Sequence, residues 1–364
     1  MNRVLCCLLL SLGVVLVQEA AGQRIRREVL KSPDGGIVFN LYFRDRQLSY
    51  LITYKGKKVI DPSALGLMVD GRKFGEGGSL GDVKRFSANE TYPWRGVHNK
   101  AVNFYNAARI QIDGTPRLGT LVLEVRVFNE GVAFRYIISN KKPGMVGDDN
   151  TEFVIPEGST IWSQPSITDY EGEYQCQKID AVPEGQRVGP PLTIQLPGET
   201  GFAAITEGGL TDFAGMSLIA HGSRTFKAVL ADSSYLQQGM ETPWRIIEIG
   251  SDLNTLVNCD IIHNVSPAFD KQLFPKGFNT DWIQPGKAAW SWLAGNGRVT
   301  VENMKRFSRW AGELGFAYNL VDSGWWRWHE DNKDQWDLLK ELVRYSYSQH
   351  VKIWVWKNYQ DRNG

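Results

Sequence analysis

Tryptophan and polar side chains gather at three places late in the sequence, each directly after an apolar run. The residues concerned are Trp290, Trp292, Asp322, Trp325, Trp326, Lys357 and Asn358. A carboxylate accepts hydrogen bonds from two neighbouring hydroxyl groups, and an indole ring can cover the apolar face of a sugar. This combination indicates a carbohydrate-binding site. The structural alternative is that Asp322 caps the segment after it, Lys357 forms an ion pair and the tryptophans fill a core.

Carboxylates are the second feature with chemical meaning. Glycoside hydrolysis normally uses two of them, and Asp322 offers one, with no convincing partner elsewhere in the sequence. The segment DYEGEY, residues 169–174, places three carboxylates close together, and clustered carboxylate oxygens are the ligands that Ca²⁺ prefers. A solvated acidic loop explains the same segment, and the residues alone favour that simpler explanation.

Strands and helices must alternate around the tryptophan-rich segments. The sequence predicts strands at 288–292, 316–322 and 351–356, and helices from the N-cap Thr300 to Gly315 and from Asp334 to Gln349. The helices are predicted from apolar residues that recur every three or four positions. Strands joined by helices of this length run parallel, with right-handed crossovers. Since functional groups gather at the carboxyl ends of parallel strands, the three groups of side chains are expected to meet there.

Three parallel strands cannot close a barrel, because a (β/α)₈ barrel takes eight units and about 250 residues. Such strands also expect burial on both faces, which two helices do not supply. We therefore expect residues 273–364 to be the start of a (β/α)₈ TIM barrel, truncated after strand three. The alternative is a small, complete α/β layer.

Residues 23–272 show a different pattern of apolar and turn residues. Short β-branched and aromatic runs alternate with turn residues, as in 36–43 and in the hairpin 121–138, which turns at Asn129-Glu130-Gly131. This pattern is typical of antiparallel strands. The length of the region favours a large sandwich over a small barrel. The predicted fold class is therefore multidomain, β followed by α/β.

The first 22 residues are typical of a signal peptide. Arg3 precedes an apolar stretch, residues 4–17, and small residues follow at Ala20-Ala21-Gly22. This pattern predicts export to the periplasm or beyond the cell, although an uncleaved anchor is an alternative. Removal of the signal leaves Cys176 and Cys259, which could pair or stay as buried free thiols.

The composition excludes some classes of partner. The 41 basic and 40 acidic residues nearly cancel, so no basic surplus indicates nucleic-acid binding. No later stretch is apolar enough for stable membrane insertion. The sequence does not indicate an oligomeric state.

Several segments together resemble glycoside hydrolase family 97, a family of exported, exo-acting α-glucosidases and α-galactosidases. The matching segments are SPDGGIVFNLYF, YKGKKVIDPSALGL, FNEGVAFRY, ETPWR, DWIQPGKAAWSWL, FAYNLVDSGWW and VKIWVW. They extend from Lys31 to the end of the chain, and ETPWR and PGKAAWSW are the most specific. The resemblance implies an N-terminal antiparallel β-super-sandwich, a catalytic (β/α)₈ TIM barrel and a C-terminal β domain.

The resemblance also implies roles for individual residues. Inverting members carry a base glutamate where this chain has Asn358, so the chain is similar to the retaining branch, whose aspartate nucleophile and acid/base glutamate would lie beyond Gly364. The fragment alone is then expected to be inactive. The resemblance implies Ca²⁺ as the cofactor with Glu173 as a ligand. It also makes Asp322 a contact to a sugar hydroxyl, near an aromatic wall that includes Trp290 and Trp292.

The expected activity is that of a retaining, exo-acting α-glycoside hydrolase, most similar to an α-galactosidase. Its substrates would be terminal α-linked sugars of oligosaccharides. An α-glucosidase of the same family and a non-catalytic carbohydrate-binding protein are the alternatives.

Overall fold

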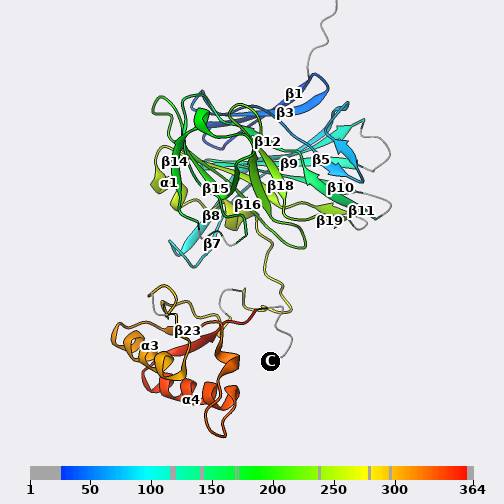
Figure 1. Cartoon of the computed structure of the whole chain (residues 1–364). Coiled ribbons are helices and arrows are strands. Elements are labelled where there is room, and N and C mark those ends of the chain that lie inside the picture. The colour runs from blue at the N-terminus through cyan, green and yellow to red at the C-terminus, as the bar shows by residue number, and fades with distance from the viewer. Residues whose placement is uncertain are drawn as a thin grey trace, which may run out of the picture. The chain divides into compact units, whose positions relative to one another are not determined.

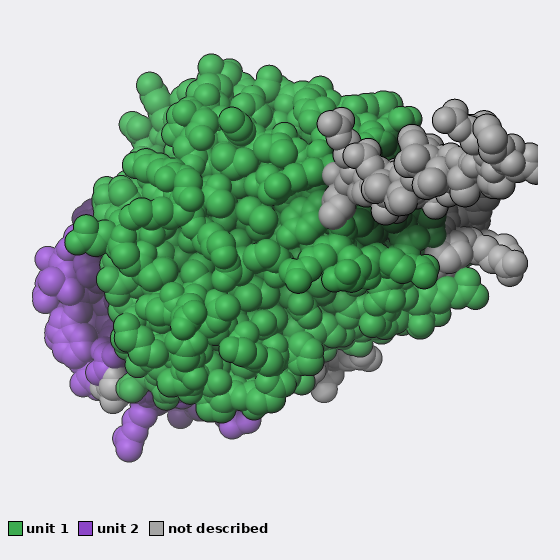
Figure 2. Space-filling view, turned by 90° about the horizontal axis from the view of Figure 1, so that it is seen from above, with its two compact units in different colours: residues 1–268 green, residues 269–364 purple. Residues whose placement is uncertain are grey.

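The computed structural model describes residues 26–114, 120–139, 143–168, 170, 172–236, 239–277, 280–294 and 297–358. The predicted signal peptide lies outside these residues. The chain forms two compact units, Met1–Ala268 (unit 1) and Phe269–Gly364 (unit 2), which are green and purple in Figure 2. Within the described residues, no helix is both long and apolar enough to cross a membrane.

Antiparallel strands dominate unit 1 (Figure 1). The strands are β1 (Arg27–Lys31), β2 (Ile37–Arg44), β3 (Gln47–Tyr54), β4 (Lys57–Ala64), β5 (Leu67–Val69), β6 (Arg72–Phe74), β7 (Ser79–Pro93), β8 (Lys100–Asp113), β9 (Thr120–Phe128), β10 (Gly131–Ser139), β11 (Gly144–Asp149), β12 (Glu152–Val154), β13 (Thr160–Gln164), β14 (Gln175–Lys178), β15 (Arg187–Gln195), β16 (Phe202–Gly208), β17 (Met216–Ala220), β18 (Thr225–Leu230), β19 (Ser234–Leu236), β20 (Met240–Glu241) and β21 (Trp244–Gly250). In the described part of the chain, seventeen of them are linked by hydrogen-bonded ladders, while β19, β11, β5 and β6 form a separate four-stranded sheet. The predicted antiparallel β region is confirmed.

The core of unit 1 follows from alternation along the strands. Residues on one face of β2 and β3 turn inward, and Phe39, Tyr50 and Phe134 meet there without solvent exposure. The rings of Phe39 and Tyr50 stack at 5.7 Å, and those of Tyr50 and Phe134 lie 5.4 Å apart. Burial of each such side chain stabilises the fold by about 1.5–3 kcal/mol.

The hairpin of β9 and β10 turns where the sequence predicts. Phe128 pairs with Gly131, so that Asn129 and Glu130 form the turn. Gly131 has a φ of 153°, and a Cβ there would lie 2.3 Å from the carbonyl oxygen of Ile247. Only glycine fits this approach between neighbouring strands.

Strand β21 is buried along its whole length. Two short helices, α1 (Leu253–Val257) and α2 (Ile261–Val265), follow it. Ile246 of β21 packs in one apolar cluster with Ile261 and Val265 of α2, so helices cover the face of the strand that turns away from the main core.

A buried arginine lies inside this strand. Arg245 is 1% exposed, and its Nε donates to Asp149 Oδ2 at 2.7 Å while its Nη1 donates to Glu207 Oε2 at 2.9 Å. Two carboxylates therefore surround one guanidinium. Burial raises the pKa of the Glu207 carboxyl, and Arg245 opposes that rise.

The two cysteines do not pair. Cys176 is exposed and Cys259 is buried, and both thiols are free. The disulfide alternative is therefore wrong, and the expectation of two buried thiols holds only for Cys259.

Parallel strands form the sheet of unit 2. Its elements are β22 (Ala288–Trp290), α3 (Val301–Glu313), β23 (Tyr318–Val321), the 3₁₀ helix η3 (Trp325–Arg327), α4 (Gln335–Ser348) and β24 (Lys352–Val355). Ala288 pairs with Tyr318, and Tyr318 pairs with Lys352, so β23 lies in the middle. The predicted parallel order of three strands and two helices is confirmed.

Caps and core residues explain the two helices of unit 2, which lie beside β23 in Figure 1. The Thr300 hydroxyl accepts from Asn303 N at the start of α3, and Asp334 accepts from the first turn of α4. Such caps each contribute about 0.5–2 kcal/mol. Met304 of α3 and Leu338 of α4 are fully buried in the core of the unit.

Candidate functional site

The carboxyl ends of β22 and β23 bring two predicted site residues into contact. Trp290 is the last residue of β22, and it pairs in register with Leu320, two positions before Asp322. The Trp290 indole Nε1 donates to Asp322 Oδ2 at 2.8 Å. Parallel pairing of the strands therefore creates the contact between the tryptophan and the carboxylate.

The other oxygen of Asp322 is also held. The backbone N–H of Ser323 donates to Oδ1 at 2.6 Å. Asp322 thus caps the residue after it, as the structural alternative predicts, yet it stays partly exposed. Each carboxylate oxygen has a second lone pair, so Asp322 can still accept hydrogen bonds from two hydroxyl groups of a ligand.

Trp325 and Trp326 follow β23 and differ in their surroundings. Trp325 is 2% exposed, and its indole donates to the carbonyl oxygen of Trp356 at 2.9 Å. Its ring face is covered, so it positions the end of β24 in this structure. Trp326 is partly exposed, and its ring centre lies 6.4 Å from that of Trp356. Of the two, Trp326 has the ring that solvent reaches.

The remaining predicted side chains of unit 2 lie at the same strand ends. Trp292 is 61% exposed and lies two positions after β22. Lys357 is exposed and Asn358 is half-buried, two and three positions after β24. The predicted residues at the three strand ends therefore present one carboxylate, one amine, one amide and two accessible indole rings besides Trp290. Such a set can bind a polyol, because it offers hydrogen-bond donors, acceptors and apolar ring faces.

Glu173 belongs to unit 1, where it lies exposed between β13 and β14. Asp169 and Glu171 of the same acidic segment lie outside the described residues. Across the described part of the chain, no group of three or more His, Cys, Asp or Glu side chains is placed to hold a metal ion. Ca²⁺ takes about six to eight oxygen ligands, so the described residues do not by themselves fit calcium.

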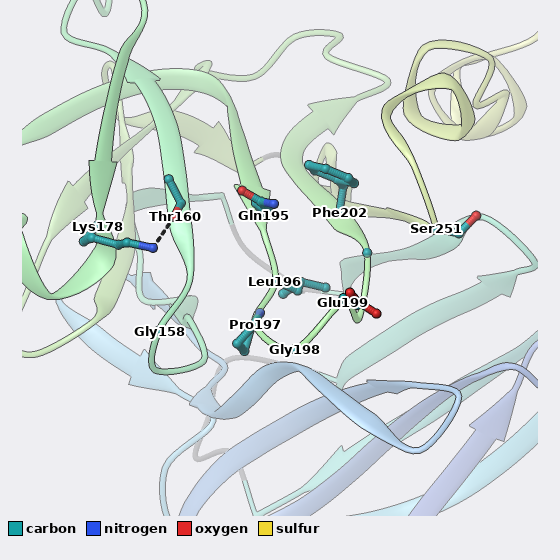
Figure 3. Close-up of a pocket in the computed structure, with 11 residues that line it drawn as sticks. Gly158, Thr160, Lys178, Gln195, Leu196, Pro197, Gly198, Glu199, Phe202 and Ser251 are labelled. Carbon is teal, nitrogen blue, oxygen red and sulfur yellow. Dashed lines mark hydrogen bonds between the residues drawn. The ribbon is translucent and has the colours of Figure 1, made fainter.

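The sequence interpretation missed a cavity in unit 1. It has a volume of about 420 Å³ and lies over β13, β15 and β16, where Thr160, Gln195 and Phe202 line it (Figure 3). These residues carry no recognisable motif. Only the register of the strands brings them together, and a single sequence does not state that register.

Comparison with known proteins identifies the family. The model of the glycosyl-hydrolase 97 N-terminal domain matches residues 30–267. The chain therefore belongs to the glycosyl-hydrolase 97 family, as the sequence motifs predicted.

Two curated relatives have similar sequences. A probable retaining alpha-galactosidase from Streptomyces bingchenggensis is 28% identical over 336 residues, which cover 86% of this chain and 49% of the relative. A retaining alpha-galactosidase from Bacteroides thetaiotaomicron is 25% identical over 413 aligned positions, covering 98% of this chain and 58% of the relative. The chain spans about half the length of these relatives.

Solved structures share the fold. A glycoside hydrolase family 97 enzyme from Pseudoalteromonas sp. strain K8 in complex with acarbose has a TM-score of 0.76 at 24% identity, with 90% of this chain and 53% of that chain covered. A beta-arabinopyranosidase has a TM-score of 0.77 at 20% identity, covering 91% of this chain and 56% of that chain. At these identities the likeness concerns the fold alone.

Proposed function

We propose that this chain is part of an exported, exo-acting α-glycosidase of the retaining type that removes terminal α-galactose from oligosaccharides. The observation that carries the proposal is the hydrogen bond between Trp290 and Asp322 at the ends of two parallel strands. The membership of the family supports it, and both curated relatives are named as retaining alpha-galactosidases.

In this proposal, the residues of unit 2 bind the terminal sugar and do not break its bond. Asp322 accepts hydrogen bonds from two hydroxyl groups, while Trp290 holds the carboxylate in place. Trp292 and Trp326 offer ring faces to the C–H groups of the sugar. Lys357 and Asn358 supply donors at the third strand end.

The proposal also includes a barrel fold for unit 2, a calcium ligand and a site of action. The strands β22, β23 and β24 would be the first strands of a (β/α)₈ barrel. The side chain of Trp354 on β24 is 49% exposed. Parallel strands are normally covered on both faces, so this exposure supports further elements that pack over β24. Glu173 would supply one ligand of a Ca²⁺ ion. The protein would act in the periplasm or outside the cell.

Two alternative functions are an α-glucosidase and a non-catalytic carbohydrate-binding protein. An α-glucosidase is favoured by solved relatives of the same family that were determined with acarbose and with panose. A non-catalytic carbohydrate-binding protein would use the same strand ends, since their side chains suffice for binding.

The test is the hydrolysis of aryl α-galactosides and aryl α-glucosides by the protein as its source secretes it. We expect faster release from the α-galactoside, and proton NMR should show the α-anomer of galactose first. A β-anomer as first product would disprove the retaining assignment, and preference for the α-glucoside would establish the alternative enzyme. Residues 23–364 alone should bind sugar without turnover; robust turnover by them would show that the catalytic groups lie within the chain.

A further inference from the structure

The cavity of unit 1 lies over one continuous row of side chains. Lys178 pairs with Thr160, Thr160 with Gln195, and Gln195 with Phe202, across the four neighbouring strands β14, β13, β15 and β16. Residues directly opposite each other in antiparallel strands point to the same face of the sheet. Figure 3 shows the four side chains in this order. The register of the sheet therefore forms a surface that no sequence motif predicts.

The row ends at a wall on its β21 side. Phe202 pairs with Gly250, and a Cβ at Gly250 would lie 2.4 Å from the Cβ of Thr255 in α1. The helix thus occupies the space of the missing side chain. Ser251, the next residue, lines the cavity at this end.

The floor and rim come from the turn between β15 and β16. Leu196 N donates to Gly201 O at 2.9 Å, and the Thr200 hydroxyl donates to Pro197 O at 2.6 Å. Lys57 from β4 donates to Gly198 O at 2.8 Å. These bonds hold the turn in one conformation, and Glu199 at its tip lines the cavity.

The chemistry of the lining is that of a polyol site. Lys178 and Thr160 are joined by a 2.9 Å hydrogen bond from the amine to the hydroxyl oxygen, and the exposed Gln195 amide supplies both a donor and an acceptor. Glu199 adds an acceptor, and the partly exposed ring of Phe202 adds an apolar face. The charges of Lys178 and Glu199 cancel, so the cavity does not favour an anion.

The size agrees with a small sugar ligand. A volume of about 420 Å³ falls within the range of roughly 300–1,000 Å³ for ligand sites. Trp162 lies two residues along β13 on the same face as Thr160 and is also partly exposed. From strand spacings, its backbone is roughly 12 Å from that of Phe202. A second ring at this distance suits a ligand of more than one sugar unit.

We infer that this row, which is built from residues of unit 1 alone, is a non-catalytic binding site for a neutral oligosaccharide. Phe202 would stack on one sugar ring, with Gln195 and Glu199 bonded to its hydroxyl groups. The inference does not need the activity proposed above, because it concerns binding by unit 1.

The test is saturation-transfer difference NMR on the purified chain, with raffinose and panose as neutral trisaccharide probes and 3′-sialyllactose as an acidic one. We expect both neutral probes to receive saturation and the acidic probe to receive less. In an Asp322→Asn background, which weakens sugar binding at the strand ends of unit 2, Phe202→Ala and Gln195→Ala should each lower the affinity for the neutral probes about tenfold, as loss of a ring contact or an amide predicts. Phe104→Ala is the matched control, since Phe104 of β8 is also a partly exposed phenylalanine on a strand.

A second variant separates the two sites. Asp322→Asn should leave probe binding at the row unchanged, and circular dichroism should show each variant folded. Binding that Phe202→Ala and Gln195→Ala leave intact, or that Asp322→Asn alone abolishes, would overturn the inference while supporting the strand-end site. Absence of any neutral-probe signal from the unaltered chain would also overturn the inference. The hydrolysis assay would still test the proposed activity independently.

Discussion

Trp290 and Asp322 are joined by a 2.8 Å hydrogen bond across 32 positions of sequence. The bond exists because β22 and β23 run parallel and end at the same edge. The Trp290 indole N–H holds the Asp322 carboxylate in place, and the carboxylate oxygens keep lone pairs that can accept hydrogen bonds from a ligand. The pair is therefore the best-defined part of the candidate site in unit 2.

Loss of the Trp290 donor should weaken sugar binding. Trp290→Phe keeps an aromatic ring but removes the N–H that holds Asp322, so the carboxylate gains freedom that binding must remove. We expect KM for an aryl α-glycoside to rise about tenfold with a smaller change in kcat, measured on the native protein. Trp282→Phe, at a 71% exposed tryptophan, is the control. Equal effects of both substitutions would show that the hydrogen bond has no special role.

The buried Glu248 should make unit 1 less stable as the pH rises. Burial raises the pKa of Glu248 from 4.5 to about 7, while a hydrogen bond with Cys259 opposes the rise. The folded state therefore binds the proton more tightly than the unfolded state. This contribution is present in full below pH 4.5 and is lost as the pH rises through about 7, a difference of about 3 kcal/mol.

Glu248→Gln tests this linkage, because the amide cannot ionise. We expect the variant to gain up to about 3 kcal/mol over the unaltered protein at pH 8 and to match it near pH 4. Urea unfolding at several pH values measures the difference. Glu157→Gln, at an exposed glutamate, should change stability little at any pH. A constant difference across the range would contradict the assignment.

Removal of the buried guanidinium should destabilise unit 1 severely. Arg245→Met leaves Asp149 and Glu207 without their shared partner, and breaking such a buried ion pair costs about 3–5 kcal/mol. Thermal and urea unfolding measure the loss, with the exposed Arg187→Met as the control. Adding Asp149→Asn and Glu207→Gln to Arg245→Met should recover part of it. No recovery would mean that packing, rather than charge, explains the loss.

Calcium dependence remains a prediction that chelation can test. We expect a chelator to reduce turnover of an aryl α-glycoside by the native protein, and added Ca²⁺ to restore it. Glu173→Gln should raise the Ca²⁺ concentration needed for half-restoration about tenfold, because one charged ligand is lost. Glu157→Gln provides a matched control. Full activity in the chelator would remove calcium from the proposal.

Local signals in the sequence predicted much of unit 2. Thr300 and Asp334 stand where caps are needed, and the apolar residues that follow each of them recur with helical spacing, so both helices begin at the predicted residues. The turn at Asn129 and Glu130 was predicted for the same reason, since its cause lies within a few residues. The barrel, of which these strands would be the start, stays a prediction.

Long-range pairing explains what the sequence did not predict. Phe202 and Thr160 are 42 positions apart by their residue numbers, and only the order β13, β15, β16 places them on one surface. Trp325 was expected to contact a sugar, yet its indole bonds to the Trp356 carbonyl inside the unit. Whether a tryptophan faces solvent depends on neighbours that residue spacing does not reveal.

The buried guanidinium of β21 also bears on how the sheet assembles. Glu207 of β16 stands directly opposite Arg245 in the ladder, and Asp149 ends β11 on a different sheet. A slip of β21 by one residue would turn Arg245 to the opposite face, away from both carboxylates. Each wrongly aligned intermediate would then carry an unpaired charge in a dry interior. The ion-paired group of Arg245, Asp149 and Glu207 thus favours the native register of β21 over registers shifted by one residue.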